Sequence, residues 1–382
     1  MGLKTVAYLV FYESCAQSLR FKRCWVSQQI YLGYSNLLNL LSFKRSNYFK
    51  VKSMNHLIRV LLLLTVISSC KKEKRPDTQV SNPVSVKSSA TYTVIVEQNV
   101  KYCQGLSHQT LNSPSYSTMD LTLDVYKPAN NTKKKPAILL IHGGGFVGGN
   151  KTDVNIVNLA NYFAARGWVA FSINYRLLGD KGTVPAQWIQ YAQSSVAAVD
   201  QSQFIAMYPA HRDAKAAVRW LIANADNYNI DTNYITVGGG SAGAVIATTL
   251  GITNTTDFTN EISLNIDPTL TTTNLNKTYT VKTILDFWGS GVAVTAVNSI
   301  YGYQRFDRSD APIMIAHGTA DSTVKYTNAI ELRDIYTSTG AAYKLHTLVN
   351  RGHGPWDAVV NGKKLEELSF DFIVEQQKLI VE

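Results

Sequence analysis

The chain has 382 residues, of which 45% are hydrophobic and 17% charged, and its formal net charge is +10. Residues 1–70 contain nine Lys or Arg and one Glu, which leaves 28 basic and 26 acidic residues, a net charge of +2, for the rest of the chain. The overall basicity therefore does not indicate binding of nucleic acid. The four cysteines and seven histidines lack the short spacings of zinc sites, so we expect no metal site and no cofactor.

An apolar stretch typical of a secretory signal peptide precedes Cys70. It follows a short, positively charged start at Met54, and its apolar core, residues 60–67, is too short to span a bilayer. The segment 67–70, Ile-Ser-Ser-Cys, also resembles the bacterial lipoprotein box, which implies that Cys70 is acylated and becomes the new N-terminus. The alternative is a cysteine that only lies close to a signal peptide.

The chain is predicted to fall into four parts. Residues 1–53 form an upstream extension outside the mature protein, residues 54–70 form the signal peptide, and residues 71–90, rich in Lys, Ser and Pro, form a flexible tether. Residues 91–382 then form one folded domain, which we expect to be lipid-anchored to a membrane of the bacterial cell envelope, on its extracytoplasmic side. Because the other three cysteines precede residue 71, Cys103 has no partner and we expect no disulfide.

Apolar periodicity in the folded domain predicts strands first and an alternation of strands and helices afterwards. The predicted strands are 92–101, 121–126, 136–142, 168–174, 234–237, 281–287, 312–317 and 343–349. The predicted helices are 154–166, 214–225, 242–250, 327–339 and 365–379. This order indicates a mostly parallel, eight-stranded sheet that begins with an antiparallel edge and carries helices on both faces.

A Gly-x-Ser-x-Gly turn occupies residues 239–243, between a predicted strand and a predicted helix. Such a turn holds its serine in a strained conformation that requires small neighbours and exposes the hydroxyl group. Ordinary tight turns also collect Gly, Ser and Ala, so the pattern alone leaves both interpretations open. The functional interpretation makes Ser241 a nucleophile.

A second motif, His142 followed by three glycines and a phenylalanine, comes directly after the apolar run 136–141. Acyl transfer through a serine creates a negatively charged oxygen, which backbone N–H groups in fixed positions stabilise. The amides of Gly144, Gly145 and Ala242 are our candidates for this oxyanion hole. A flexible loop is the alternative, and a nucleotide-binding P-loop is not supported because no Lys-Ser/Thr pair follows.

From residue 91 to residue 372 the chain resembles the α/β-hydrolase esterases and lipases of the hormone-sensitive-lipase-like and acetyl-xylan/feruloyl-esterase-like groups. The resemblance rests on six motifs in the order of those families: Leu140 to Phe146, Asn174-Tyr175-Arg176, Asp213 through Arg219-Trp220, the serine turn, His317 to Asp321, and Gly352-His353-Gly354. It implies an α/β-hydrolase fold and a serine nucleophile.

A triad on this fold needs a histidine base after Ser241, with an acid between the two in the chain. Three histidines follow the serine. His346 lies in a predicted strand, and His317 ends one and precedes the acid, so we interpret both as structural. His353 lies in a loop between glycines, where its imidazole can reach the serine, and we therefore expect it to be the base.

Asp321 is our candidate for the acid because it follows a strand, at the edge of a parallel sheet where catalytic groups collect. Asp286 is the main rival, but it lies inside an apolar strand. Asp307 and Asp310 resemble turn residues. Asp213 is interpreted as a structural residue that caps or pairs on the following helix.

The segment 177–212 is a long insertion with aromatic residues. It forms either part of the acyl or alcohol pocket or a solvent-facing helix pair with aromatic packing.

These observations predict a serine carboxylic-ester hydrolase that acts through a covalent acyl-enzyme on small-molecule or polysaccharide-linked esters, with acetyl or feruloyl groups, or short acyl chains in general. A serine peptidase of the same fold and a non-catalytic surface-binding lipoprotein are the alternatives.

Overall fold

The computed structural model describes residues 84–382 except residue 133. The predicted extension 1–53, the signal peptide 54–70 with Cys70, and positions 71–83 of the tether lie outside the described residues. None of the helices after residue 83 combines the length and the apolar character that are needed to cross a bilayer.

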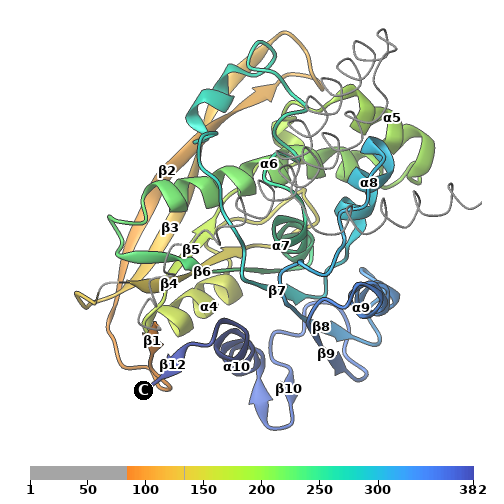
Figure 1. Cartoon of the computed structure of the whole chain (residues 1–382). Coiled ribbons are helices and arrows are strands. Elements are labelled where there is room, and N and C mark those ends of the chain that lie inside the picture. Colours follow the sequence, from red (N-terminus) through yellow and green to blue (C-terminus); the bar gives the residue numbers. More distant parts are fainter. Residues whose placement is uncertain (1–83, 133) are drawn as a thin grey trace, which may run out of the picture. The chain divides into compact units, whose positions relative to one another are not determined.

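An eight-stranded sheet forms the centre of the domain (Figure 1). Its order is β2-β3-β5-β4-β6-β7-β8-β9; β2 pairs antiparallel with β3, as β3 does with β5, and all other neighbours are parallel. The predicted sheet with its antiparallel edge is thus confirmed. The strands are β2 (Val94–His108), β3 (Tyr116–Pro128), β4 (Lys135–Ile141), β5 (Val169–Ile173), β6 (Ile230–Gly240), β7 (Thr283–Phe287), β8 (Ile313–Gly318) and β9 (Tyr343–Leu348).

Helices cover both faces of the sheet, as predicted. Helices α4 and α10 pack on one face, and α6, α7, α8 and α9 pack on the other (Figure 1). Helix α8 was not predicted, although its buried residues Ala293, Val294, Ala296 and Val297 follow helical spacing; its valines are also typical of strands. The bounds are α4 (Val154–Ala164), α6 (Gln201–Ala223), α7 (Ala242–Ile252), α8 (Val292–Tyr301), α9 (Thr327–Thr339) and α10 (Leu365–Gln377).

The central strand β4 shows how the sequence specifies both layers. All seven of its residues are buried. Ile138 and Leu140 pack in the apolar cluster with α4 and α10, whereas Leu139 and Ile141 pack in the cluster with α6 and α7. Because successive side chains of a strand point to opposite faces, a continuous apolar run is what a strand between two helical layers requires.

The folded domain begins earlier than predicted. Strand β1 (Ser85–Val86) pairs in parallel with β12 (Ile380–Val381), although residues 84–90 were assigned to the flexible tether. The side chains of Val84 and Val86 are 4% and 2% exposed, so burial of these two valines holds the segment against the domain. A second short pair consists of β10 (Val359–Val360) and β11 (Lys363–Lys364).

The insertion 177–212 forms the 3₁₀ turn η1 (Leu178–Asp180), helix α5 (Ala186–Ser195) and the first part of α6. Helix α6 was predicted to begin at residue 214, but it begins at Gln201 and continues through Pro209.

Aromatic packing explains why α6 is longer than predicted. The indole of Trp188 on α5 stacks on Phe204 of α6 with ring centroids 4.7 Å apart, and its Nε1–H donates to the Phe204 carbonyl oxygen at 2.9 Å. Tyr208 and Phe258 pack against the same indole. The first turns of α6, from residue 201 to residue 213, therefore bury an aromatic face that the sequence pattern did not indicate.

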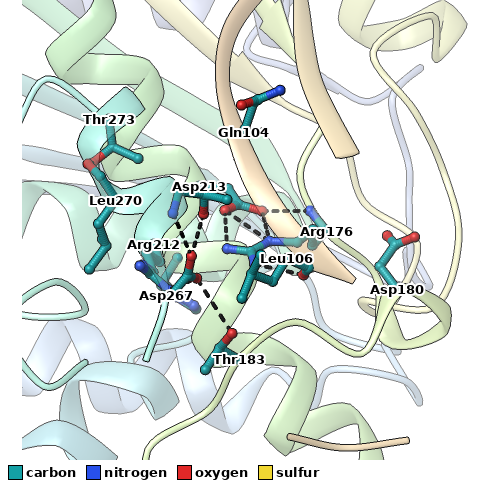
Figure 2. Close-up of polar contacts among 12 residues, drawn as sticks. Gln104, Leu106, Arg176, Asp180, Thr183, Arg212, Asp213, Asp267, Leu270 and Thr273 are labelled. Carbon is teal, nitrogen blue, oxygen red and sulfur yellow. Dashed lines mark hydrogen bonds and ion pairs between the residues drawn. The ribbon is translucent and has the colours of Figure 1, made fainter. Parts of the chain in front are cut away.

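One buried ion pair connects α6 to the chain that follows β5, and a second connects α6 to Asp267, which precedes the 3₁₀ turn η2 (Pro268–Thr272) (Figure 2). Asp213, predicted to act on its own helix, lies inside α6 and accepts hydrogen bonds from the Arg176 guanidinium at 2.6–3.1 Å and from the Arg176 backbone N–H at 2.9 Å. Arg176 also donates to the carbonyl oxygen of Leu106, and the neighbouring Arg212 pairs with Asp267 at 2.7 Å. Buried charges need such partners, so this network fixes the chain just beyond β5.

Candidate active site

Ser241 lies at the sharp turn between β6 and α7. Its backbone has φ 54° and ψ −122°, a strained conformation for a residue with a side chain. A methyl group on Gly239 would lie 2.5 Å from the Ile141 carbonyl oxygen, and one on Gly243 would lie 2.1 Å from the same atom. Only glycine fits at these two positions, which explains the sequence of the turn.

The structure brings the predicted nucleophile, base and acid together. The Ser241 hydroxyl lies 2.9 Å from His353 Nε2, and His353 Nδ1 lies 2.7 Å from Asp321 Oδ2. Ser241 follows β6, Asp321 follows β8 and His353 lies in the loop after β9. All three therefore come from loops at the carboxyl ends of parallel strands, although 112 residues separate the serine from the histidine.

The carboxylate of Asp321 is fixed from both sides. Its Oδ1 accepts the backbone N–H groups of Thr323 and Val324, each at 2.9 Å, which leaves Oδ2 for His353. His317 Nε2 donates to the Val324 carbonyl oxygen at 2.7 Å and lies 3.4 Å from Asp321 Oδ2. A fixed carboxylate at Nδ1 holds the imidazole in the tautomer whose Nε2 can accept the serine proton.

The glycine loop after β4 packs directly on the serine turn. A methyl group on Gly143 would lie 2.9 Å from the Gly240 carbonyl oxygen and 3.4 Å from Ser241 Cβ. Gly144 and Gly145 have φ angles of 106° and 61°, in the region that favours glycine. The three glycines are therefore needed to bring this backbone alongside the hydroxyl group.

The three predicted oxyanion donors have no competing acceptors. Among the hydrogen bonds of the described residues, none is donated by the backbone N–H of Gly144, Gly145 or Ala242. Gly144 and Gly145 line the same cavity as Ser241, and Ala242 is the first residue of α7. Unpaired amides beside a nucleophile are suited to an anionic oxygen, and the positive end of α7 adds to this preference.

Tyr175 supports the glycine loop from behind. Its hydroxyl group donates to the His142 carbonyl oxygen at 3.0 Å and lies 3.3 Å from that of Gly143, and its ring stacks on the His142 imidazole with centroids 4.3 Å apart. The next residue, Arg176, is held by Asp213. The buried ion pair thus positions a tyrosine that orients the peptide planes leading to the oxyanion donors.

A cavity of about 410 Å³ opens above Ser241. Glycine backbone forms one side, and Trp288, Trp356, Ile156 and Asp153 contribute side chains to the rest. The two tryptophans and Asp153 were not predicted from the sequence. Trp288 directly follows a strand, Trp356 follows the candidate base His353, and Asp153 follows the glycine loop, and these positions could have identified them.

The rival acid Asp286 lies elsewhere in the hydrogen-bond network. Its carboxylate accepts the Gly289 N–H at 2.8 Å and the Thr248 hydroxyl at 2.9 Å. Complete burial raises the pKa of Asp286 above its ordinary value. Asp286 therefore links the end of β7 to α7, and it has no hydrogen bond to His353 among the described contacts.

The remaining alternative residues lie outside the cavity. The Asp307 N–H donates to the Asp310 carboxylate at 3.0 Å in the turn before β8, as predicted for turn residues, and His346 lies in β9. Between residues 84 and 382, no group of three His, Cys, Asp or Glu side chains is arranged to hold a metal ion.

The insertion 177–212 borders the glycine loop without entering the cavity above Ser241. It lines a separate apolar cavity of about 430 Å³ together with Leu111 and its neighbours. A methyl group on Gly145 would lie 3.0 Å from the amide nitrogen of Gln203, and the Leu178 N–H donates to the Phe146 carbonyl oxygen at 2.7 Å. The insertion is therefore a helix pair with aromatic packing that also supports the outer side of this loop.

Residues 123–202 and 190–299 match the BD-FAE family. Esterase LipC of Mycobacterium tuberculosis is 30% identical over 133 residues, which are 34% of this chain and 27% of that protein. Gut esterase 1 of Caenorhabditis briggsae is 32% identical over 34% of this chain and 21% of that protein, and carboxylesterase 1C of Mus musculus is 26% identical over 43% of this chain and 28% of that protein. The matched part thus spans about a quarter of the length of these relatives.

Solved structures match over a larger part of the chain. Thermogutta terrifontis esterase 2 phosphorylated by paraoxon has a TM-score of 0.52 at 22% identity, over 73% of this chain and 94% of that one. The apo form of the same esterase has a TM-score of 0.51 with the same coverage and identity. The chain therefore has the α/β-hydrolase fold, which confirms the fold that the sequence motifs implied.

Proposed function

We propose that this α/β-hydrolase-fold chain is a serine carboxylesterase that works through a covalent acyl-enzyme. The observation that carries the proposal is the continuous hydrogen-bonded relay from Ser241 through His353 to Asp321, placed beside unpaired backbone amides. The esterases among its relatives support an ester over an amide substrate, and they give no support to a non-catalytic role.

The chemistry follows from this geometry in two halves. In the first, His353 Nε2 takes the Ser241 proton while Oγ forms a bond to the ester carbonyl carbon, and the amides of Gly144, Gly145 and Ala242 hold the resulting oxyanion. When the carbonyl re-forms, the carbon–oxygen bond to the alcohol breaks, and His353 donates its proton to the leaving oxygen. In the second half, water replaces the alcohol, and the acyl group leaves as a carboxylic acid.

Ester hydrolysis with a matched pair of variants tests the proposal. Wild-type protein is expected to hydrolyse p-nitrophenyl acetate, and Ser241→Ala is expected to lower kcat by about 10⁴-fold or more. A serine-reactive phosphonate should add one phosphonyl mass to the wild type and none to Ser241→Ala. Ser194→Ala, at an exposed serine on α5, is the control for unspecific labelling. Near-native hydrolysis or labelling of Ser241→Ala would reject the mechanism.

The substrates are proposed to be acetyl or feruloyl esters of carbohydrates. The support is the sequence resemblance to acetyl-xylan and feruloyl esterases together with the envelope location expected from residues 54–70. Acetylated xylan, methyl ferulate and p-nitrophenyl esters of increasing chain length are the test. The highest kcat/KM on a long-chain p-nitrophenyl ester, with none on the first two substrates, would contradict this assignment.

Anchoring through Cys70 is a separate proposal that rests on the lipoprotein-like segment 67–70. A single acyl chain gives weak membrane binding, and stable anchoring takes more than one. In a bacterial host the full chain should fractionate with membranes and accumulate as a precursor when lipoprotein signal peptidase is inhibited, whereas Cys70→Ala should lose the lipid. A native protein recovered from the cytosol with Met1 at its N-terminus would overturn this proposal.

A further inference from the structure

Two indole rings form the wall of the cavity beside the candidate base. Trp288 and Trp356 contact each other edge to face, with centroids 4.7 Å apart and planes at 80°. The Trp288 ring also meets the His353 imidazole edge to face at 6.4 Å. No motif in the sequence analysis includes either tryptophan, and both line the cavity that contains Ser241.

A strained turn holds Trp288 in this wall. Its φ angle is +48°, which is a rare conformation for a bulky residue and is found most often at functional sites. The turn is closed by Asp286, whose carboxylate accepts the Gly289 N–H at 2.8 Å. A methyl group on Gly289 would lie 2.5 Å from Ala244 Cβ on α7, so the turn is packed tightly against the helix that begins after Ser241.

Trp356 is placed by the same loop that carries His353. Its backbone N–H donates to the Gly354 carbonyl oxygen at 2.9 Å, and its ring lies over the serine turn, where a methyl group on Gly240 would be 2.7 Å from the indole. Trp288 is 1% exposed, whereas Trp356 is only partly buried. The Trp356 ring is therefore available to a ligand in the cavity.

Asp153 sets the charge of the cavity. Among the described residues it is the one carboxylate in the cavity lining, and no Lys or Arg side chain joins it there. Its carboxylate already accepts the N–H groups of Asn155 and Ile156 at the start of α4, which fixes its position. An exposed, fixed carboxylate accepts hydrogen bonds from hydroxyl groups and repels an anionic ligand.

The reaction itself decides which half of an ester faces this wall. His353 must donate its proton to the leaving alcohol, so the alcohol lies on the side of the imidazole, while the carbonyl oxygen lies against Gly144 and Gly145. Trp288 and Trp356 are the aromatic side chains on the side of His353. The alcohol half of the ester is thus the part that contacts the indoles.

We propose that Trp288, Trp356 and Asp153 form an alcohol subsite that accepts a neutral pyranose ring. The C–H face of the sugar packs on the accessible part of the Trp356 indole, and its hydroxyl groups donate to the Asp153 carboxylate. A sugar that carries a carboxylate is disfavoured by the same aspartate. This inference rests on the proposed esterase function and specifies its leaving group.

The test keeps the acyl group constant and varies the alcohol. The substrates are a mono-O-acetylated methyl β-xyloside, ethyl acetate and a mono-O-acetylated methyl glucuronoside. Trp356→Ala is expected to lower the ratio of kcat/KM for the xyloside ester to that for ethyl acetate by about fivefold to tenfold, and Trp356→Phe should restore most of that ratio. Asp153→Asn should raise kcat/KM for the anionic glucuronoside ester about threefold, because asparagine keeps the helix cap and removes the charge.

Controls separate this inference from the proposed function. Trp220→Phe, at a tryptophan that packs on Phe171 and does not line the cavity, should leave the ratio unchanged. Binding of methyl β-xyloside to the Ser241→Ala protein, measured by isothermal titration calorimetry, should disappear when Trp356→Ala is added. Hydrolysis of all three esters with an unchanged ratio in Trp356→Ala would overturn the subsite alone. Absence of Ser241-dependent hydrolysis of any ester, p-nitrophenyl acetate included, would instead overturn the function.

Discussion

Two buried carboxylates in this molecule differ in their partners. Asp213 is paired with the permanently charged guanidinium of Arg176, and both side chains are 2% exposed. Asp321 has a fully buried side chain but faces the imidazole of His353, which is 25% exposed and can gain or lose a proton. The pair of Asp213 with Arg176 keeps the same charges throughout and stabilises the fold. The pair of Asp321 with His353 lets a proton move to and from the imidazole beside a fixed carboxylate.

The largest effect on activity is expected from Asp321→Asn. The amide would keep the shape of the acid but favour the wrong tautomer of His353, so kcat should fall by about 10³- to 10⁴-fold while the melting temperature changes little. Hydrolysis of p-nitrophenyl acetate together with thermal unfolding measures both. A large loss of stability without a loss of activity would reverse the roles assigned to the two aspartates.

Asp213→Ala should have the opposite profile. It would leave the Arg176 guanidinium buried without its partner, which costs about 3–5 kcal/mol in the free energy of unfolding. Urea denaturation measures this change. Lys87→Ala, which breaks an exposed pair with Glu382, is the matched control and should change stability much less than Asp213→Ala. Equal destabilisation by both variants would show that burial of the pair is unimportant.

A third buried carboxylate, Asp310, is expected to make the stability of the protein depend on pH. Burial raises the pKa of Asp310 from 3.8 to about 7, and no Lys or Arg within the described chain forms an ion pair with it. Because the folded state retains the proton that the unfolded chain releases near pH 4, this group should make the protein less stable as the pH rises from about 4 to about 7. A shift of this size corresponds to about 4 kcal/mol, and screening by the solvent around the exposed residues 307–309 reduces the expected loss to on the order of 2 kcal/mol.

Asp310→Asn should remove that part of the pH dependence and stabilise the protein at pH 8. Urea denaturation from pH 4 to pH 8 follows the effect, with Asp226→Asn, at an exposed aspartate, as the control. Identical pH profiles for wild type and Asp310→Asn would show that this carboxylate titrates normally.

The smallest effect is expected from Tyr175→Phe. Tyr175 lies between the Arg176–Asp213 ion pair and the glycine loop of the active site. Loss of the hydroxyl group removes the hydrogen bond to the His142 carbonyl oxygen. Since a neutral hydrogen bond contributes about 1 kcal/mol, we expect kcat to fall about fivefold with little change in KM. A change confined to KM would indicate that Tyr175 acts on substrate binding instead of on the oxyanion loop.

Local patterns allowed much of the fold and the proposed relay to be predicted. The serine turn and the glycine loop depend on close backbone approaches that glycine alone permits, so they leave a signature in the sequence. Asp321 and His353 follow strands of a parallel sheet, where the topology brings distant loops together. The structure places both beside Ser241.

The features that were missed depend on contacts between segments far apart in the chain. In the sequence, Trp288 and Trp356 could each belong to an apolar core. They line the cavity because Trp288, after β7, contacts Trp356 in the loop that carries His353. The early start of α6 depends on the packing of Trp188 against Phe204. The partner of Asp213 likewise lies 37 residues away, on a different element. Single-sequence patterns carry little information about such pairings.

The pairing of β1 with β12 has a practical consequence for the topology of the chain. Ser85 and Val86 lie opposite Ile380 and Val381, and the Ser88 N–H donates to the carbonyl oxygen of Glu382 at 3.0 Å. The two ends of the described domain are therefore neighbours, and a short peptide is long enough to join them. New termini could then be placed at the exposed tip of the β10–β11 hairpin. The fold is therefore suited to circular permutation, with the paired ends β1 and β12 joined by the peptide.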